Sequence, residues 1–463
     1  MRPALFLLAI MLLSRTALAA PPAHPQAEAQ ALDLAKKAIA LRSVVGSGNK
    51  TPEVAKLYSD ALIQGGFKPS DVTITSYRDT AYLIARWPGS DAALKPFVIS
   101  GHMDVVEAKP SDWQRDPFTP IVENGYLFGR GATDMKLSGT IVIAALTELR
   151  RQGFKPRRTL ILEFSGDEET DMKTGAIIAE KLKDAELVLN ADDGGGRLNE
   201  KTGQPEYFTW NGAEKTYADF KLSVSNPGGH SSEPRKDNAI SQLAAALVRI
   251  GQYHFKPELN ELTRAYFVEA AKHVGDAKTA AAMRAFAANA QDKAAIETLT
   301  ADPNMVGKIG TTCVATMISG GHAQNALPQR AEANINCRIF PGHKPQDIMA
   351  ELKKVAAEPA LTISDVTGGS VATDASPMRA DFVAAVKKAL GIAYPGTPII
   401  PAQASGASDS MWFRYHHVPS YGAAPIFTKA SEDFSHGLNE RTPIADIGPS
   451  IDYYLSLVPD LTK

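Results

Sequence analysis

Apolar runs that alternate with helical patterns constrain the fold of this chain more than any other feature. From about residue 30 to 195 the runs are AYLIARW (81–87), PFVISGHMD (96–104), TLILEFSGDEE (159–169) and AELVLNADD (185–193). Helical patterns cover 27–44, 51–67 and 137–153. Strands that alternate with helices predict an open α/β sheet with mostly parallel strands. Because ligands bind at the carboxyl ends of the strands in such sheets, polar residues at these ends are candidates for a functional site.

A different order of elements begins near residue 215. Strand patterns at 217–225, 311–321, 331–340 and 361–366 are joined by helical patterns at 237–253 and 345–357. This βαββαβ order predicts a compact unit with its own antiparallel sheet, inserted into the first domain. We therefore expect a first domain made of residues 20–214 and 371–463 and an inserted domain at 215–370. An alanine-rich stretch at 255–305 predicts an extra helical segment within the insertion, and 441–461 predict a helix that docks on the first domain.

Residues 1–19 predict a secretory signal peptide. Arg2 precedes an apolar run at 4–13, and Ala17-Leu18-Ala19 fits a cleavage site with small residues. The run is too short for a permanent membrane span, although an uncleaved anchor is the alternative interpretation. We expect an exported protein, periplasmic or secreted, without membrane contact after cleavage and with a flexible leader at 20–30. The net charge of −2 gives no electrostatic reason to expect nucleic acid as a partner.

Acidic residues and histidines follow several of the predicted strands. They are His102, Asp104, Asp134, Glu168, Glu169, Asp192 and Asp193, and His436 lies near the carboxyl terminus. Adjacent carboxylates repel each other, so SGDEET (165–170) on its own indicates a solvated loop. Two divalent metal ions ~3.5–4 Å apart would neutralise converging carboxylates, and histidine with carboxylate ligands suits catalytic zinc. Asp104 would then hold the second ring nitrogen of His102.

The spans 98–106, 128–136, 160–170 and 186–196, together with His436, resemble the co-catalytic zinc peptidase and amidase family. Its members include aminoacylase, acetylornithine deacetylase, succinyl-diaminopimelate desuccinylase, carboxypeptidase G and carboxypeptidase S. The resemblance implies an α/β zinc-peptidase catalytic domain with a mostly parallel sheet and an inserted α+β lid or dimerisation domain. It also implies that Asp104 orients His102 and that Glu168 is the general base. Two divalent metal ions, with zinc favoured, would be held by His102, Asp134, Glu169, Asp192 and His436.

Some of these assignments have rivals in the sequence. Asp193 is the alternative to Asp192, because the two aspartates are adjacent where the family has a single acidic residue. His416 and His417 are the alternatives to His436, although they follow an aromatic run and favour packing.

The inserted domain adds candidates through the same resemblance. His230 in SNPGGHSSEPRKDNA would reach the scissile carbonyl, often from a partner subunit, and the alternative is a histidine in a turn. Asn325 and Arg338 resemble a substrate-binding hairpin, and the planar guanidinium of arginine matches a substrate carboxylate. Gly406 in ASGASDSMWF resembles a glycine-rich substrate loop. Because family members often dimerise through the lid, a homodimer is expected unless the 255–305 segment covers that surface.

We therefore expect an exported dinuclear zinc hydrolase. It would cleave the amide bond of a small peptide or N-acyl amino acid next to a free carboxylate, in the manner of a carboxypeptidase, dipeptidase or aminoacylase. The alternatives are a related zinc aminopeptidase, which would lack the lid, and a binding homologue that has lost catalysis.

The two cysteines lie symmetrically about Asn325. The midpoint of Cys313 and Cys337 is (313 + 337)/2 = 325, so a symmetric hairpin would set them opposite each other. Export favours a disulfide between them, and two free buried thiols are the alternative.

Overall fold

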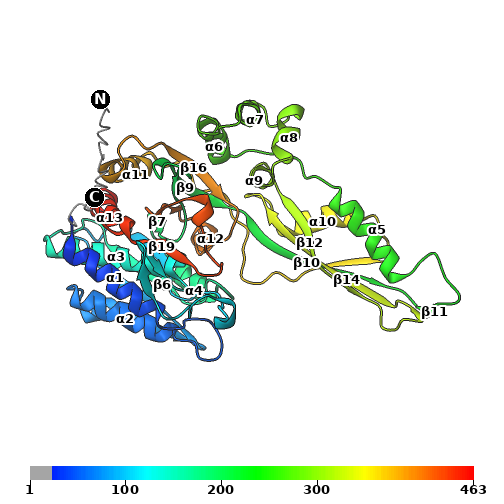
Figure 1. Ribbon diagram of the computed structural model, residues 1–463, viewed down its shortest axis with the longest axis horizontal. Coiled ribbons are helices and arrows are strands. Elements are labelled where there is room, and N and C mark those ends of the chain that lie inside the picture. Colours follow the sequence, from blue (N-terminus) through cyan, green and yellow to red (C-terminus); the bar gives the residue numbers. More distant parts are fainter. Residues whose placement is uncertain (1–22) are drawn as a thin grey trace, which may run out of the picture.

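The computed structural model describes residues 23–463, and the predicted signal peptide at 1–19 lies outside the described residues. A mostly parallel α/β body and an elongated second unit make up the molecule (Figure 1). Among residues 23–463, none of the helices has the length and apolar character needed to cross a membrane.

A ten-stranded sheet forms the centre of the body, in the order β1-β2-β6-β3-β7-β17-β9-β8-β18, with β16 paired to β9. β3 (Phe97–His102) runs parallel to both β6 (Leu160–Ser165) and β7 (Leu187–Asn190), and all three strands are fully buried. Strands buried on both faces read as continuous apolar runs, which is why the sequence signal was clear here. The other strands are β1 (Val72–Tyr77), β2 (Thr80–Trp87), β8 (Gly195–Leu198), β9 (Pro205–Glu214), β16 (Ile399–Ala404), β17 (Ser420–Gly422) and β18 (Phe427–Thr428).

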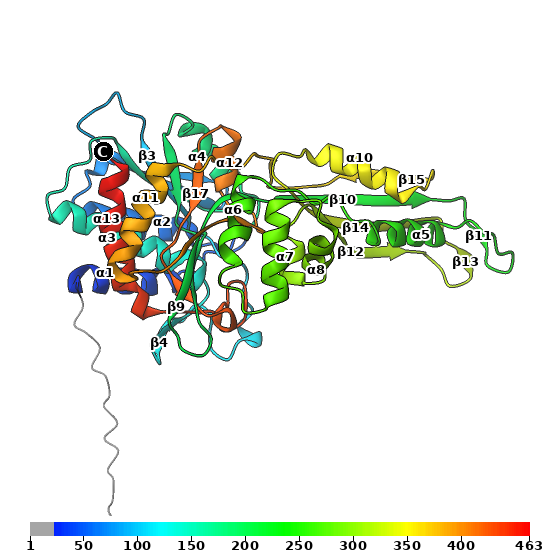
Figure 2. The ribbon, with the colours of Figure 1, turned by 90° about the horizontal axis from the view of Figure 1, so that it is seen from above.

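Helices cover both faces of this sheet. One face and its helices share a large apolar core, and those helices are α1 (Pro25–Ile39), α2 (Thr51–Gln64), α3 (Leu137–Arg151), α11 (Ala380–Ala393) and α13 (Ile447–Leu461). α4 (Lys173–Lys181) and α12 (Ser410–Tyr415) cover the other face. A small sheet of β4 (Ile121–Glu123), β5 (Tyr126–Phe128) and β19 (Arg441–Pro443) lies at the periphery. Figure 2 shows α1, α3, α11 and α13 gathered at one side of the body, so the expected docking of the last helix is confirmed.

The expected flexible leader at 20–30 is wrong from Pro25 onward. α1 begins at Pro25, and Ala27 and Ala31 are completely buried in the core. Proline suits the first turn of a helix because the amide hydrogen it lacks would have no helical partner there. The His24 ring also lies 2.8 Å from an oxygen of Asp452, which ties the helix start to α13.

A four-stranded antiparallel sheet forms the second unit, in the order β12-β14-β10-β15. Two helices, α5 (Ala239–Gly251) and α10 (Pro345–Ala356), pack on one of its faces. We call these six elements the lid, and their order along the chain confirms the expected βαββαβ pattern. The strands are β10 (Thr216–Ser225), β12 (Thr312–Gly320), β14 (Arg330–Ile339) and β15 (Leu361–Asp365), and the short strands β11 (Gly229–His230) and β13 (Ala326–Leu327) pair at the far tip of the lid (Figure 1).

Residues 255–305 are helical, as expected, but they pack mainly against the body. The segment contains α6 (Glu261–Ala270), α7 (Ala277–Ala288), α8 (Lys293–Thr300) and α9 (Pro303–Val306). Phe267, Met283 and Phe286 form a separate apolar core that includes Ile400 of β16. The helical segment therefore stands beside the ten-stranded sheet and does not extend the lid sheet.

The two cysteines form the disulfide, which was one of the two alternatives. Cys313 and Cys337 are direct partners in the β12–β14 ladder, with their Cα atoms 4.1 Å apart. The symmetry of the hairpin about Asn325 predicted this pairing, and the bond ties an edge strand of the lid to its neighbour.

Candidate metal centre

Three parallel strands deliver the central residues to one edge of the sheet. His102 is the last residue of β3, and Ser165 at the end of β6 is its direct partner in the ladder. Glu168 and Glu169 follow β6 by three and four residues, and Asp192 follows β7 by two. The carboxyl ends of parallel strands share an edge, so residues far apart in sequence meet there.

Two groups of potential ligands share the carboxylate of Asp134. In one group, the His102 Nε2 atom lies 2.9 Å from Asp134 Oδ1 and 3.5 Å from Asp192 Oδ1. In the other, the His436 Nε2 atom lies 3.1 Å from Asp134 Oδ2 and 3.0 Å from Glu169 Oε2. The ligand atoms of each group lie within 4.8 Å of one another. Each oxygen of Asp134 thus faces a different group, which is the arrangement of a carboxylate that bridges two cations.

The pKa values of these carboxyl groups also favour a bound cation. Burial, reinforced by the charge of Asp134, raises the pKa of Asp192 to about 7. Burial raises the pKa of Glu169 as well. Asp134 is the exception, because hydrogen bonds from His102 and His436 outweigh its burial and lower its pKa. Like charges crowded into one buried site are stabilised by a cation, and nitrogen with carboxylate oxygen is a suitable donor set for zinc. The residues present therefore fit two divalent ions.

Asp104 holds the backbone of the two glutamates in place at this edge of the sheet. Its carboxylate is fully buried and accepts hydrogen bonds from the backbone amides of Glu168 and Glu169, at 3.1 and 3.0 Å. The His102 Nδ1 atom lies 3.0 Å from the backbone oxygen of Asp104 and 3.6 Å from its carboxylate. The second nitrogen of His102 therefore has the main chain of Asp104 as its nearer partner, and the side chain mainly fixes the two glutamates.

Glu168 is placed beside the ligands without belonging to either Asp134 group. Its carboxylate approaches His102 and Glu169 within the same 4.8 Å limit. Burial raises the pKa of Glu168 well above its ordinary value, against the opposing charge of His102. A carboxylate with a raised pKa next to a metal centre is suited to accept and return a proton near neutral pH.

The sequence did not identify Glu440, which fixes the loop that carries Asp134. Its carboxylate accepts hydrogen bonds from the backbone amides of Gly131, Thr133 and Asp134, at 3.0, 2.7 and 3.0 Å. Its other partner is Arg130, at 2.6 Å, and both side chains are buried. The only signal in the sequence was the position of Glu440 four residues after His436.

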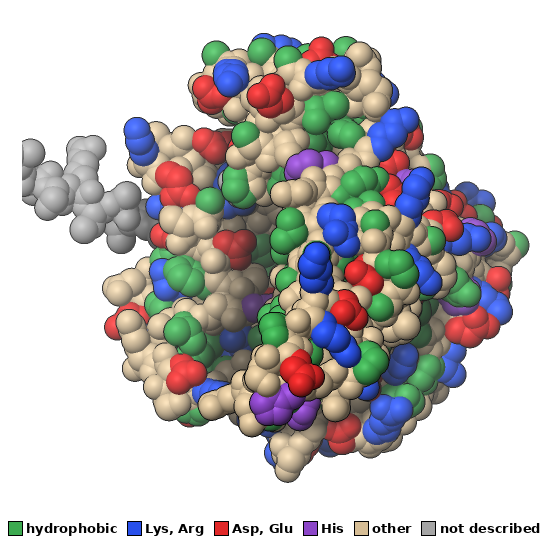
Figure 3. Space-filling model, turned by 90° about the vertical axis from the view of Figure 1, so that its right-hand side faces the viewer, with side chains coloured by type: hydrophobic (Ala, Val, Ile, Leu, Met, Phe, Trp, Pro, Cys, Tyr) green, Lys and Arg blue, Asp and Glu red, His purple; other side chains and the backbone are tan. Residues whose placement is uncertain are grey.

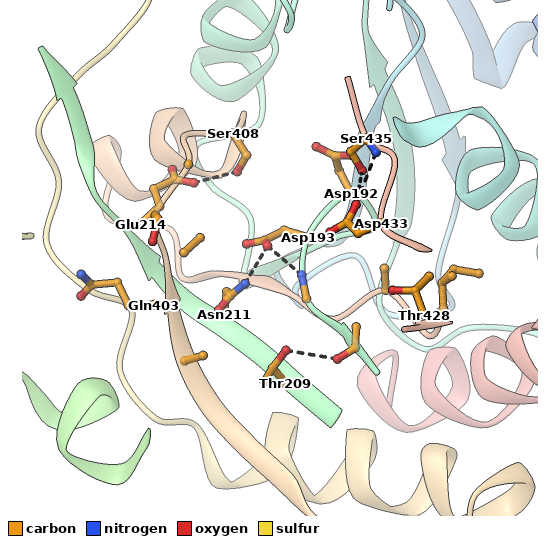
Figure 4. Close-up of a pocket in the computed structure, with 18 of the residues that line it drawn as sticks. Asp192, Asp193, Thr209, Asn211, Glu214, Gln403, Ser408, Thr428, Asp433 and Ser435 are labelled. Carbon is orange, nitrogen blue, oxygen red and sulfur yellow. Dashed lines mark hydrogen bonds between the residues drawn. The ribbon is translucent and has the colours of Figure 1, made fainter. Parts of the chain in front are cut away.

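Asp193 and the rival histidines lie outside both ligand groups. Asp193 Oδ1 accepts hydrogen bonds from Asn211 Nδ2 at 2.6 Å and from the Gly194 amide at 2.7 Å, away from Asp192 (Figure 4). His416 lies 3.4 Å from Glu180 on α4. Of the described residues, His102 and His436 are the histidines in the ligand groups.

Within one chain, the lid candidates do not meet the metal centre. His230 and Asn325 lie together at the tip, where the Ser231 amide donates to the Asn325 carbonyl at 3.1 Å. Figure 1 shows β11, which ends at His230, at the end of the lid farthest from the body. Arg338 lies at the other end of β14, with its guanidinium 4.8 Å from the centre of the Tyr217 ring.

A cavity of about 760 Å³ opens directly onto the metal centre. Asp134, Asp192 and Gly406 line it, so of the substrate-binding candidates only Gly406 reaches this space among the described residues. Figure 4 shows how Asp192, Asp193, Asn211 and Glu214 lie around it. Seen from the end of the lid, the surface of the molecule is hollowed beside the lid (Figure 3).

Both the sequence and the fold of this chain are similar to those of known proteins. The sequence model of the peptidase family M20/M25/M40 matches residues 98–460. A probable carboxypeptidase S-like protein of Dictyostelium discoideum is 28% identical over 82% of this chain and 74% of its own length. An N-fatty-acyl-amino acid synthase/hydrolase of Danio rerio is 27% identical over 80% and 73%. Among solved structures, an M20 family metallo-carboxypeptidase of Sulfolobus solfataricus has the same fold, with a TM-score of 0.71 at 20% identity over 94% of this chain and 99% of that chain.

Proposed function

Because the chain belongs to the peptidase family M20/M25/M40 and is thus a hydrolase of amide bonds, we propose a specific reaction for it. The protein is an exported dinuclear zinc enzyme that cleaves small peptides or N-acyl amino acids next to a free carboxylate. The observation that carries this proposal is the pair of ligand groups joined by Asp134. Their residues, His102, Asp134, Glu169, Asp192 and His436, would hold the two ions.

The protein residues supply the proton transfers of the reaction. Two bound divalent ions would lower the pKa of water and polarise the substrate carbonyl. Glu168 takes a proton from the attacking water and returns it to the leaving amine, and its position beside His102 and Glu169 supports this role. Asp104 keeps Glu168 and Glu169 in place through their backbone amides. Arg338 and Gly406 remain our candidates for contacts with the substrate.

A homodimer through the lid would explain the position of His230. β12 is an edge strand of the lid sheet, and Val314, Met317 and Ile318 on it are 61%, 71% and 66% exposed. Exposed apolar edge strands tend to pair with another chain. In such a dimer, His230 and Asn325 of one copy would serve the metal centre of the other, and the His230 imidazole would stabilise the oxyanion.

The proposed export is supported by the disulfide. Disulfides persist in oxidising compartments, and Cys313–Cys337 is the single bridge among the described residues. The predicted signal peptide at 1–19 would direct the chain to the periplasm or the medium.

Metal analysis combined with a substrate panel tests the proposal. We expect two zinc ions per chain and hydrolysis of dipeptides or N-acyl amino acids that carry a free carboxylate. Hydrolysis only of substrates with a free amino terminus would favour an aminopeptidase. Two bound ions without turnover on any amide would favour a binding protein.

A further inference from the structure

Two cations line the cavity away from the metal centre. Arg197 on β8 and Lys308, just after α9, share this cavity with Asp134 and Asp192, and among the described residues they are its only lysine or arginine. Two of the acidic residues in its wall already have partners within the protein. Asp193 accepts from Asn211, and Glu214 forms a buried ion pair with Arg414.

Neither cation is neutralised by the protein. Arg197 makes no ion pair with the described residues, and its Nη1 atom is buried without a hydrogen-bond partner. The Lys308 ammonium group lies 4.8 Å from the centre of the Tyr266 ring and has no carboxylate within ion-pair distance in residues 23–463. Burial lowers the pKa of Lys308. Buried donors without acceptors destabilise a fold, so an anion bound here would satisfy groups that the protein leaves unpaired.

Two tyrosines connect the cations into one wall. Tyr207 on β9 is the direct ladder partner of Arg197, so their side chains emerge on the same face of the sheet. Tyr207 and Tyr266 both line the cavity and pack against the same apolar cluster, which contains Phe267 and Phe286. Tyr266 and Lys308 both come from the helical segment and its exit. The segment at 255–305 thus completes this side of the cavity.

We propose that Arg197 and Lys308 form a subsite for a carboxylate of the substrate while its amide lies at the metal centre. This inference rests on the proposed function. The carboxylate has two sources: it is either the one next to the scissile bond or a second one, on an acidic side chain or a dicarboxylic acyl group. A cavity of about 760 Å³ is within the range of small-molecule sites and accommodates either source.

Paired substrates measure the subsite directly. The variants are Lys308→Met and Arg197→Met, which keep most of the apolar stem, with Lys308→Arg as the conservative change. Lys278→Met on the exposed side of α7 is the matched control. The first two pairs are N-acetylglutamate with N-acetylglutamine and N-succinylalanine with N-acetylalanine. In the third kind of pair, each N-acyl amino acid is compared with the analogue whose carboxylate next to the scissile amide is replaced by a carboxamide.

We expect kcat/KM to fall about tenfold or more for the charged member of one pair and less than about twofold for its neutral partner. The pair that shows this difference identifies the source of the carboxylate. Lys308→Arg and Lys278→Met should keep the wild-type preference. Equal effects on charged and neutral members of every pair would overturn the subsite.

Calorimetry with glutarate separates this inference from the proposed reaction. Wild-type protein should bind glutarate, and both methionine variants should weaken the affinity about tenfold while Lys278→Met does not. If no amide is hydrolysed but the affinities change in this way, the reaction is wrong and the subsite stands. If amides are hydrolysed but neither glutarate binding nor charge preference depends on Lys308 and Arg197, the subsite is wrong.

Discussion

At the scale of single residues, the two adjacent glutamates have different environments. Glu169 lies 3.0 Å from His436 in a ligand group, whereas Glu168 stands outside both groups that contain Asp134. Glu168→Gln keeps the shape of the side chain and removes its basicity, so kcat should fall about 10²–10⁴-fold. Metal content should remain at two ions per chain by mass spectrometry. A variant with near-normal turnover would show that another group is the base.

Asp192 and Asp193 differ in what they contact, although the sequence could not distinguish them. Asp192 faces His102, and Asp193 is bonded to Asn211. Asp192→Asn should lower the zinc stoichiometry to about one per chain, because one of the two ligand groups loses an oxygen ligand. Asp193→Asn should retain two ions, and loss of metal in that variant instead would reverse the assignment.

Glu440 should act on the metal centre without touching it. Glu440→Gln weakens the hydrogen bonds that hold Gly131, Thr133 and Asp134, so metal affinity should fall about 10–100-fold. Competition with a chromogenic chelator measures this affinity. Added zinc should restore kcat, which a globally unfolded variant would not allow. Glu432→Gln, which changes a half-buried glutamate bonded to Tyr126, is the control.

At the scale of elements, the residue at the start of α13 makes stability depend on pH. Burial raises the pKa of Asp446 to about 7 from an ordinary 3.8, despite hydrogen bonds from the Phe427 amide and the Tyr394 hydroxyl. Between these values the folded protein holds a proton that the unfolded chain has lost, so this residue makes stability fall as pH rises from about 4 to about 7. Above that window its contribution is constant.

Asp446→Asn should remove this dependence. The side-chain amide can accept from the Phe427 amide and donate to the Tyr394 hydroxyl. The difference in melting temperature between the variant and wild type should therefore increase, in favour of the variant, as pH rises from 5 to 8. Asp184→Asn, at an exposed position, should show no such trend. A constant difference between Asp446→Asn and wild type across this range would contradict the buried, protonated carboxyl group.

The elements also show what the sequence could and could not predict. The buried strands β3, β6 and β7 and their terminal ligands were predictable, because apolar runs and strand ends are local signals. The helical pattern at 27–44 was predicted as well, but the order of the preceding leader from Pro25 onward was not. Ala27 and Ala31 lie among polar residues in the sequence and become core residues only when α13 and α3 pack on them. Glu440 and Lys308 act through groups distant in sequence, so no local pattern marks them. The disulfide requires that the two cysteines lie opposite each other and that their strands approach closely there. The symmetry of the hairpin predicted the first condition but not the second.

At the scale of the whole molecule, the distance between the lid tip and the metal centre suggests two cooperating chains. Each chain carries the candidate metal-ligand residues in its body and His230 at the far end of its lid (Figure 1). In a closed symmetric dimer, each lid contributes to the other chain's site, so both sites are equivalent. Light scattering should therefore give twice the chain mass, and Ile318→Glu on the exposed edge of β12 should shift it toward the monomer.

Complementation between two inactive chains tests whether His230 acts across such a dimer. Glu168→Gln lacks the base, and His230→Ala lacks the oxyanion donor, whose loss costs about 10²–10³-fold in kcat. When the two variants are co-expressed with different tags, a mixed dimer contains one site with an intact Glu168 and the partner's intact His230. Random pairing gives mixed dimers in half of the population with one of two sites active, so about a quarter of wild-type activity should return.

If His230 acted within its own chain, each chain would carry one defect in its own site and no activity would return. Each variant expressed alone is the control, and the tandem-purified mixed dimer should have about half of the wild-type activity per dimer.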